Sequence, residues 1–574
     1  MRTKWAALLL TLVVGFTTAC AGGAVTPSAG DSAAAPVPTG PGRTVTFLSH
    51  VEPLSMSDHR AITSTGSAPT DAIRMFNASL YLADDRGVFQ PYLTERKPEL
   101  NTDTWRVFPD GRMETVYTLR SGITWHDGVP FTAEDMVFSW RVAKTPEFGV
   151  SELLPTRLMD DVVAVDERTI LVRWSRVLPR AESPSGRDWA PLPRHLLERD
   201  FEAQRADAFA SHPYWTRDYV GLGPFKLDRR EPGAFVEGSA FDAHILGRPK
   251  IDRIKIQFVA DPNTAVANLL AGEAHMAIDF TLGFEQGALL KREWSARQGG
   301  SVLLSPDKLR YVQIQFRPEY GNPLLMSDVR VRKALLHAVD KRGLLDALLD
   351  GEGQGAEGMA PPLVDYADQV DRAIAKYSYD LQAAERLLAD AGLTRTSGGL
   401  VAAANGERFA PELRATAGGQ EEREAAILAD GWRRIGVDTP MRLLSAVEDR
   451  DREIRAVFPG MGTANTGLDD DTLYLKLYTA NIPTAASRWA GSNRGGWSNP
   501  SYDRFYDVMT SNLDRSERVQ AIVGMSRLVS EEVPILPMYY NLLVLAHVSD
   551  LSGPKAYAPG GEATWNAHLW EMKR

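Results

Sequence analysis

The sequence predicts a mixed α/β fold, because strand-like segments alternate with helix-like segments along most of its length. The chain has 574 residues, of which 44% are hydrophobic and 24% are charged. This composition is ordinary for globular proteins, and the length suffices for several domains of about 150 residues each. The net charge of −10 argues against a nucleic-acid-binding protein, which would need a basic surface.

The first 42 residues predict an export signal followed by a flexible tether. Arg2 and Lys4 precede the apolar run WAALLLTLVVGF, a pattern that indicates a signal peptide over residues 1–19. The run is shorter than the roughly 20 residues that a membrane-spanning helix needs. Residues 20–42 are almost entirely Ala, Gly, Pro, Ser and Thr, so we expect this segment to form no packed core.

Cys20 is the single cysteine of the chain, which excludes an intramolecular disulfide and a multi-thiolate zinc site. Its position after an apolar run and Thr-Thr-Ala resembles a bacterial lipobox, although Thr17 stands where that motif usually has Leu. The resemblance implies that Cys20 is acylated, becomes the mature N-terminus and holds the protein on a membrane surface. The alternative is an unmodified cysteine near a conventional cleavage site.

Four segments predict strands, because they alternate apolar and polar residues and are rich in β-branched and aromatic side chains. The folded part of the chain begins at the first of them. These segments are RTVTFLSH (43–50), ERTILVRWS (167–175), RIKIQFVA (253–260) and RYVQIQFRP (310–318).

Three longer segments predict helices from apolar residues at i, i+3, i+4 and i+7. Ser327 is placed to cap a helix over residues 328–351. The segment YDLQAAERLLADAGL predicts a helix that ends at Gly392, and RSERVQAIVGMSRLVSEEVP predicts one that ends before Pro534.

The segment LRSGITWHDGVPFTAEDMVFSW, residues 119–140, places a histidine and three acids close together. Asp127 and the glycine after it form a typical turn dipeptide. Thr132 and Asp135 have capping-box spacing at the start of an amphipathic helix. A catalytic base would also need a positioned partner, which this segment does not supply. We therefore expect His126, Asp127 and Asp135 to be structural rather than catalytic.

The same segment resembles the signature of the family 5 extracellular solute-binding proteins, the receptors of peptide and nickel ABC importers. Further segments resemble that family in the same order along the chain, so that the resemblance extends from about residue 43 to residue 570. They are VGLGPFKL, SDVRVRKALLHAVDKRGLL, YDLQAAERLLADAGL, WRRIGVD, GWSNPSYDRFYDVM and SEEVPILPMYYN.

The resemblance implies a type II periplasmic-binding-protein fold, in which two hinge-linked α/β lobes enclose a central ligand cleft. The chain would cross between the lobes near Ser305 and near Pro537. The implied lobe I comprises residues 43–80, 215–304 and 538–574, with an extra subdomain at 81–214, and lobe II comprises residues 305–537.

The candidate ligand-binding stretch is residues 456–500. In peptide-binding members of the family, an aspartate in this region meets the α-ammonium group of the peptide. Here Phe458 is followed by Pro-Gly-Met-Gly-Thr, without an acid. Because a buried ammonium group without a carboxylate partner is costly, either the aspartates at 469–471 substitute or the ligand is not a conventional peptide. The candidate ligand-binding residues are Phe458, Asp469, Asp471, Trp489, Arg494 and Trp497.

These candidates have simpler structural interpretations. Asp469 and Asp471 belong to a run of like charges, which is typical of a solvated loop. A tryptophan is often simply part of the core.

The sequence gives no support for nucleotide binding, for hydrolase chemistry or for a zinc site. Gly353, Gly355 and Gly358 satisfy G-x-G-x-x-G, but a helix rather than a strand precedes them, so we expect a simple loop. The sequence contains no G-x-S-x-G, no phosphate-binding G-x-x-x-x-G-K-[ST] and no H-E-x-x-H. We therefore expect no catalytic residues, no metal site and no cofactor.

The expected function is that of a substrate-binding lipoprotein of an ABC import system. It would capture a peptide or peptide-like solute between two lobes and deliver it to a membrane permease with its ATPases. We expect a monomer on the extracytoplasmic side of the cell membrane. The alternatives are a secreted hydrolase, and a related receptor that serves as a sensor or chaperone.

Overall fold

The computed structural model describes residues 44–59, 70–148, 155–186, 189–558 and 561–573. Residues 43–574 form one compact unit. The predicted signal peptide (1–19), Cys20 and the predicted tether (20–42) lie outside the described residues. Within the described part, no helix is long and apolar enough to cross a membrane.

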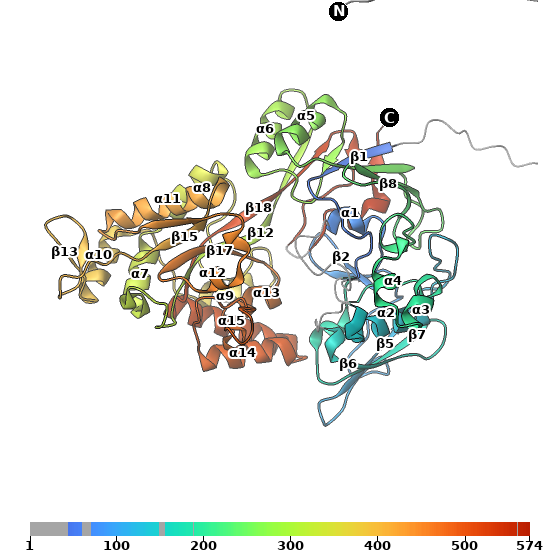
Figure 1. The fold of residues 1–574 in the computed structure, drawn as a ribbon, viewed down its shortest axis with the longest axis horizontal. Coiled ribbons are helices and arrows are strands. Elements are labelled where there is room, and N and C mark those ends of the chain that lie inside the picture. The colour runs from blue at the N-terminus through green and yellow to red at the C-terminus, as the bar shows by residue number, and fades with distance from the viewer. Residues whose placement is uncertain (1–43, 60–69, 149–154, 187–188, 559–560, 574) are drawn as a thin grey trace, which may run out of the picture. The chain divides into compact units, whose positions relative to one another are not determined.

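The compact unit is organised around a ten-stranded mixed sheet (Figure 1). Its two longest strands pair antiparallel along nearly their whole length and lie in the middle of the sheet. From one edge to the other, the strands are β16 (Met441–Leu444), β15 (Leu413–Thr416), β17 (Met461–Gly467), β12 (Gly300–Ile314), β18 (Ile535–Val548), β11 (Met276–Ala277), β1 (Thr44–Ser49), β10 (Arg253–Phe258), β9 (Phe235–Ala240) and β8 (Phe225–Glu231).

The two long strands have different neighbours at their two ends. β18 pairs with β11 near His547, whereas β12 pairs with β17 from Lys308 to Ile314. The register of the β12–β18 pair shifts between Pro306 and Lys308, opposite the middle of β18. Such a bulge bends a strand and increases its twist. β12 and β18 run through both halves of the sheet, and the two halves meet where the pairing of these strands is irregular.

Around β12 and β17 the sheet is covered on both faces, and the side chains of β12 alternate between them. Val312 and Ile314 join one apolar cluster, and Leu309 and Tyr311 join the other. The first cluster includes residues of α7 (Val329–His337), α8 (Lys341–Leu349), α10 (Leu381–Asp390) and α11 (Gly419–Arg434). The second includes residues of α9 (Ala367–Ala373), α13 (Asp470–Leu475), α14 (Pro500–Ser511) and α15 (Arg515–Glu532).

Around β1 and β10 the sheet is also covered on both faces. One face packs against α5 (Pro262–Ala271) and α6 (Phe284–Ser295). The other face contains Phe47, whose ring centroid lies 5.9 Å from that of Trp570. The last residues of the chain therefore return to the first strand, where β19 (Leu551–Ser552) pairs with β20 (Glu571–Met572).

A second, four-stranded antiparallel sheet has the order β4 (Trp105–Val107), β5 (Met113–Thr118), β7 (Thr169–Trp174) and β6 (Met159–Ala164). Helix α2 (Ala133–Lys144) packs against β6 and β7. An apolar cluster that includes Trp125 and Trp174 fills this part of the chain. The remaining helices and strands are α1 (Thr70–Arg74), α3 (Arg194–Glu202), α4 (Ala206–Ala210), α12 (Arg452–Ala456), β2 (Tyr81–Ala83), β3 (Phe89–Pro91), β13 (Thr394–Arg395) and β14 (Val401–Ala402).

The four predicted strands are confirmed as β1, β7, β10 and β12, and α2, α10 and α15 confirm three predicted helices. The single helix predicted over residues 328–351 is wrong, because the structure has two, α7 and α8. Asp328 caps the first, and Asp340 caps the second by accepting a hydrogen bond from the backbone of Gly343 at 2.8 Å. An aspartate offers the backbone this alternative to a continuous helix. Ser327, the predicted cap, donates to the carbonyl of Leu324 instead.

Candidate functional site

The histidine of the 119–140 segment is a buried structural residue. His126 Nδ1 accepts a hydrogen bond from the Gly221 backbone at 3.1 Å, and Nε2 donates to the Gly223 carbonyl at 3.0 Å. Burial lowers the pKa of His126 to about 4, so the ring is neutral at pH 7. A Cβ atom on Gly221 would lie 2.1 Å from the carbonyl oxygen of Phe76. His126 thus joins two segments that resemble family motifs, and Gly221 leaves room for the backbone of Phe76.

The aspartates of the same segment are also structural. Asp135 accepts hydrogen bonds from the backbones of Thr132 at 2.9 Å and Arg194 at 3.0 Å, which confirms the predicted cap of α2. Asp127 accepts from the backbone of Val129 within its turn and is 2.8 Å from His195 Nε2. The predicted turn at Asp127 and the predicted cap at Asp135 are confirmed.

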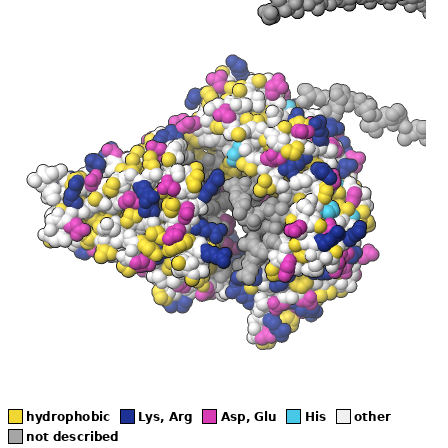
Figure 2. Space-filling view, viewed as in Figure 1, with side chains coloured by type: hydrophobic (Ala, Val, Ile, Leu, Met, Phe, Trp, Pro, Cys, Tyr) yellow, Lys and Arg dark blue, Asp and Glu magenta, His cyan; other side chains and the backbone are white. Residues whose placement is uncertain are grey.

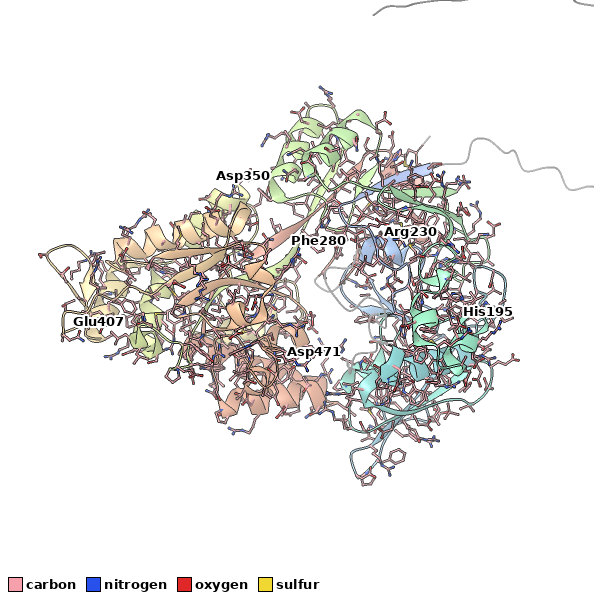
Figure 3. The ribbon with its side chains drawn as sticks, in the orientation of Figure 1. His195, Arg230, Phe280, Asp350, Glu407 and Asp471 are labelled. Atoms are coloured by element: carbon pink, nitrogen blue, oxygen red, sulfur yellow. The ribbon has the colours of Figure 1, made fainter. Side chains whose placement is uncertain are left out.

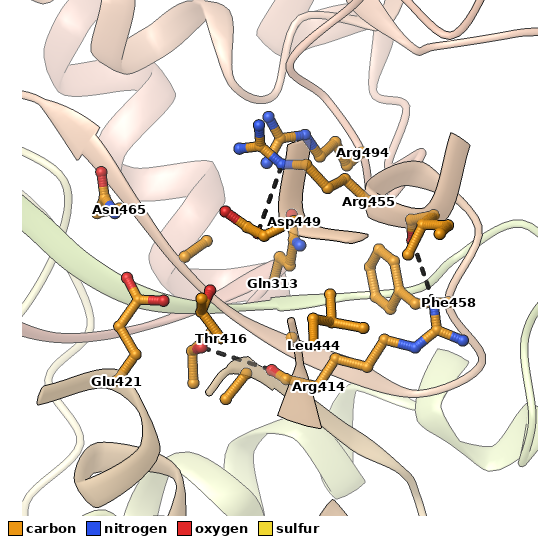
Figure 4. Close-up of a pocket in the computed structure, with 15 residues that line it drawn as sticks. Gln313, Arg414, Thr416, Glu421, Leu444, Asp449, Arg455, Phe458, Asn465 and Arg494 are labelled. Carbon is orange, nitrogen blue, oxygen red and sulfur yellow. Dashed lines mark hydrogen bonds and ion pairs between the residues drawn. The ribbon is translucent and has the colours of Figure 1, made fainter. Parts of the chain in front are cut away.

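A polar pocket lies where β15 and β16 end, against the middle of β17 (Figure 4). Crevices at the carboxyl ends of parallel strands are a general location for ligand sites in α/β proteins. The cavity has a volume of about 90 Å³. Its lining residues are Gln313, Arg414, Ala415, Thr416, Glu421, Leu444, Asp449, Ile454, Arg455, Phe458, Gly462, Thr463, Ala464, Asn465 and Arg494.

Two charged residues of the lining have close partners of opposite charge. Arg414 donates to Glu412 at 2.8 Å and to the carbonyls of Ile454 and Val457 at 3.1 and 2.7 Å. Glu421 is 2.8 Å from the guanidinium group of the buried Arg310. These side chains are held in place by the protein itself.

The other two arginines of the lining lack such partners. The guanidinium group of Arg494 forms no hydrogen bond or ion pair with another described residue, and that of Arg455 is 3.9 Å from Asp449. Figure 4 shows both guanidinium groups on the same side of the pocket. Burial and the positive charge of Arg455 lower the pKa of Arg494.

Lys476 lies outside the lining of the pocket but adds a third positive charge within electrostatic range of these arginines. It lies at the C-terminal end of α13, and its ammonium group has no hydrogen-bonding or ionic partner in the described part of the chain. Burial, followed by the charges of Arg494 and Arg455, lowers the pKa of Lys476 to about 8. Asp469 opposes this shift, but its carboxylate also caps α13.

The six predicted ligand-binding residues lie in different places. Phe458 and Arg494 line the pocket, and Phe458, at 2% exposure, forms part of its apolar wall. Asp469 accepts from the backbone of Thr472 at 2.9 Å as the N-cap of α13.

Asp471 and the two tryptophans lie outside the lining of the pocket. Asp471 forms an ion pair of 2.6 Å with Arg180, and Figure 3 shows it at the edge of its helical layer that faces the four-stranded sheet. Trp489 packs edge-on against Tyr320, with ring centroids 6.4 Å apart. Trp497 is buried, and its indole nitrogen donates to Glu532 at 3.1 Å.

Sequence reasoning missed Arg455, Gln313 and Asn465, which line the pocket, and Lys476, which interacts electrostatically with its arginines. Arg455 belongs to the charged run EDRDREIR, which reads as solvated surface. Lys476 and Asn465 lie inside the 456–500 stretch, so their basic and amide side chains could have been proposed as ligand-binding groups from the sequence.

The glycine-rich segment around Gly353 is a loop after α8, as predicted. Gly353 has a φ of 83°, and Gly355 forms a bridge with Tyr539 of β18. Among the residues that the structure describes, no three His, Cys, Asp or Glu side chains are grouped as metal ligands.

Comparisons with known proteins agree with this architecture. Residues 95–483 match the family described as bacterial extracellular solute-binding proteins, family 5 Middle. The oligopeptide-binding protein AppA of Bacillus subtilis is 23% identical over 517 residues, covering 89% of each chain. Heme-binding protein A of Haemophilus influenzae is 25% identical over 495 residues, covering 81% of this chain and 83% of that protein.

A solved structure of a periplasmic oligopeptide-binding protein from Thermotoga maritima covers 92% of this chain and 99% of its own, with a TM-score of 0.77 and 18% identity. At this identity the likeness establishes the fold. The predicted fold class, that of the periplasmic binding proteins, is confirmed.

Proposed function

Because the chain belongs to the family 5 bacterial extracellular solute-binding proteins, we propose that it captures a peptide-like small solute and delivers it to the permease of an ABC import system. The chain is a binding protein and not an enzyme. The observation that carries the proposal is the pocket at the ends of β15 and β16, where Arg455 and Arg494 present charges that close protein partners do not neutralise.

The capture mechanism is a hinge motion of two lobes. Lobe I comprises residues 43–80, 215–304 and 538–574 with the subdomain 81–214, and lobe II comprises residues 305–537. The bulge at Pro306–Lys308 and the opposite part of β18 act as the hinge, within a few residues of the boundaries expected from the sequence. A solute that contacts both lobes shifts the equilibrium towards the closed form.

Some of the direct contacts between these lobes are ion pairs of exposed side chains, which suit reversible closure. Lys291 is 2.7 Å from Glu352, and Arg423 is 2.7 Å from Glu285. These side chains are exposed, and exposed ion pairs contribute only about 0–1 kcal/mol each. Figure 2 shows several Lys and Arg side chains close together near the middle of the face in view.

The anchor is an acylated Cys20 that follows a cleaved signal peptide, residues 1–19. The proposal is supported by the basic start, the apolar run and the lipobox-like Thr-Thr-Ala-Cys sequence. Two or more acyl chains at one residue suffice for stable attachment to a membrane. The folded unit would then act on the extracytoplasmic side, close to the permease.

The test is identification of the small molecule that the purified protein carries. Mass spectrometry of the denatured protein identifies candidate solutes, and thermal unfolding measures binding. A solute that binds only the native state increases the unfolding free energy by RT ln(1 + [L]/Kd). Uptake of that solute should be lost in cells that lack this protein. Catalytic consumption of the solute would instead support a hydrolase, and unchanged uptake would support a sensor or chaperone.

A further inference from the structure

We propose that Arg455, Arg494 and Lys476 form a subsite that binds an anionic group of the solute, a carboxylate or a phosphate. The inference rests on the proposed function and specifies the chemistry of the solute. The three residues, called the cation cluster below, come from α12, from the loop that precedes α14 and from the end of α13. Two of them line the same cavity, and the charges of both lower the pKa of the third.

Among the described residues, no acid makes a close ion pair with the charged groups of the cation cluster. Asp449 is 3.9 Å from Arg455 and also acts on Arg494, but its side chain is 41% exposed, so solvent screens these interactions. Asp469 acts on Lys476 but also caps α13. Glu421 is 2.8 Å from Arg310, which it shares with Glu424, and Glu421 also interacts with Arg455 at longer range. The other arginine of the lining, Arg414, has its own carboxylate at 2.8 Å. The protein thus pairs the neighbouring charges closely and leaves these three without a close partner.

Such an arrangement is unfavourable in the absence of a bound anion. Like charges brought together at partly buried positions repel each other and lose hydration. The lowered pKa of Lys476, about 8, and the lowered pKa of Arg494 reflect both effects. A bound anion removes the repulsion, whereas a neutral or ammonium-bearing group does not. The free energy that destabilises the empty cluster therefore favours binding of a negative group.

The geometry of the side chains suits an oxyanion. A guanidinium group can donate two parallel hydrogen bonds to a carboxylate or phosphate, and an ammonium group adds a point charge. The amide groups of Gln313 and Asn465 supply further donors in the same pocket. Phe458 offers an apolar surface for the carbon skeleton next to the anionic group.

The experiment measures the thermal unfolding of the purified full-length protein in rising concentrations of sodium phosphate or sodium acetate at pH 7. Sodium chloride keeps the ionic strength constant. The variants are Arg494→Gln and Lys476→Met, and the control is Arg292→Gln. Arg292 is an exposed residue of α6 that has no hydrogen-bonding or ionic partner among the described residues. General salt effects act on all variants alike.

We expect wild type and Arg292→Gln to be stabilised by at least one of the two anions. The preferred anion distinguishes a carboxylate subsite from a phosphate subsite. In Arg494→Gln and Lys476→Met the Kd for that anion should rise about tenfold or more, since each removes a charged hydrogen-bond donor. Both variants should unfold at a higher temperature than wild type without anion, because repulsion is relieved. A higher unfolding temperature would show that a variant with a weaker anion response is still correctly folded.

Equal anion responses in the cluster variants and in Arg292→Gln would overturn the proposal. Binding and import of the solute give a second measurement, which separates failure of the anionic subsite from failure of the proposed function. If the protein binds and imports a solute that carries no acidic group, the anionic subsite is wrong and the import function stands. If the anion response depends on the cation cluster but no solute is bound or imported, the import function is wrong and the subsite stands.

Discussion

The guanidinium group of Arg180 lies 2.6 Å from the carboxylate of Asp471, and this ion pair joins the 179–182 turn to α13. The two side chains are 48% and 37% exposed. Because they belong to the two proposed lobes, the pair acts as a weak latch of about 0–1 kcal/mol. We expect Asp471→Asn to leave the melting temperature nearly unchanged, to increase the radius of gyration of the solute-free protein and to raise the solute's Kd several-fold.

Small-angle scattering and calorimetry measure these two effects. The matched control is Asp365→Asn, which breaks the exposed 2.6 Å ion pair with Arg515 inside lobe II. An Asp471→Asn variant that scatters and binds like the control would contradict the role of a latch.

Lys476 makes stability depend on pH. Its pKa is about 8 in the folded protein, below its usual value of 10.5, because of burial and of Arg494 and Arg455, with Asp469 acting in the opposite direction. Between these two pH values the unfolded chain binds more protons than the folded protein, so the unfolding free energy rises with pH. Below pH 8 Lys476 is charged in the folded protein, and the resulting loss of unfolding free energy is fully present. One unit of pKa shift corresponds to about 1.4 kcal/mol.

The measurement is the difference in unfolding free energy between wild type and Lys476→Met from pH 7 to pH 10. Taking the difference removes the titration of other lysines and tyrosines. Wild type should approach the variant in stability as the pH rises through this window. A constant difference would show that the pKa of Lys476 is not lowered.

The buried charges that hold α11 to the sheet are essential for stability. Glu424, which is 0% exposed, accepts hydrogen bonds from Arg310 Nε and Nη2 at 2.9 and 2.8 Å and from the Tyr539 hydroxyl at 2.6 Å. In Glu424→Ala the buried guanidinium group of Arg310 would keep Glu421 as its one remaining carboxylate partner among the described residues. We expect a loss of about 3–5 kcal/mol in unfolding free energy.

Urea denaturation followed by tryptophan fluorescence measures this loss. Glu517→Ala serves as the control, because Glu517 is an exposed residue of α15, and it should change stability by less than about 0.5 kcal/mol. A similar small effect for Glu424→Ala would show that solvent reaches Arg310 and compensates for the lost carboxylate.

His126 contributes to stability and not to solute recognition. His126→Ala removes a neutral ring that has a hydrogen bond at each nitrogen, so we expect a loss of about 2–4 kcal/mol. The Kd of the solute for His126→Ala, measured well below the melting temperature of this variant, should stay within about twofold of the wild-type Kd. The control, His50→Ala, changes an exposed histidine and should alter neither quantity. Weaker binding without loss of stability would place His126 in the solute site.

The sequence predicted those parts of the structure that depend on local patterns. The alternation in RIKIQFVA, the helical spacing in YDLQAAERLLADAGL and the capping box at Thr132 all reappear in the structure. The break between α7 and α8 was missed, because an aspartate inside an apolar pattern does not reveal whether its side chain caps a new helix.

The pocket was harder to predict, because its residues come together through sheet pairing. Gln313 lies on β12, Arg455 on α12 and Asn465 on β17, and their proximity depends on a strand register that no local pattern specifies. Arg494 was predicted as a ligand-binding residue and lines the pocket, but the two other cations of the cluster were not identified. The sequence showed that an acid was missing after Phe458, and the structure shows that Arg455 and Arg494 line the same pocket as Phe458.

The central claim is that the protein reversibly binds an anionic solute through the cation cluster. Its most direct test is isothermal calorimetry of the solute identified by mass spectrometry, titrated into wild type, Arg494→Gln and Arg292→Gln. We predict stoichiometric, reversible binding to wild type and Arg292→Gln, and a Kd at least about tenfold higher for Arg494→Gln. Equal affinity for all three proteins, or steady consumption of the solute, would contradict the claim.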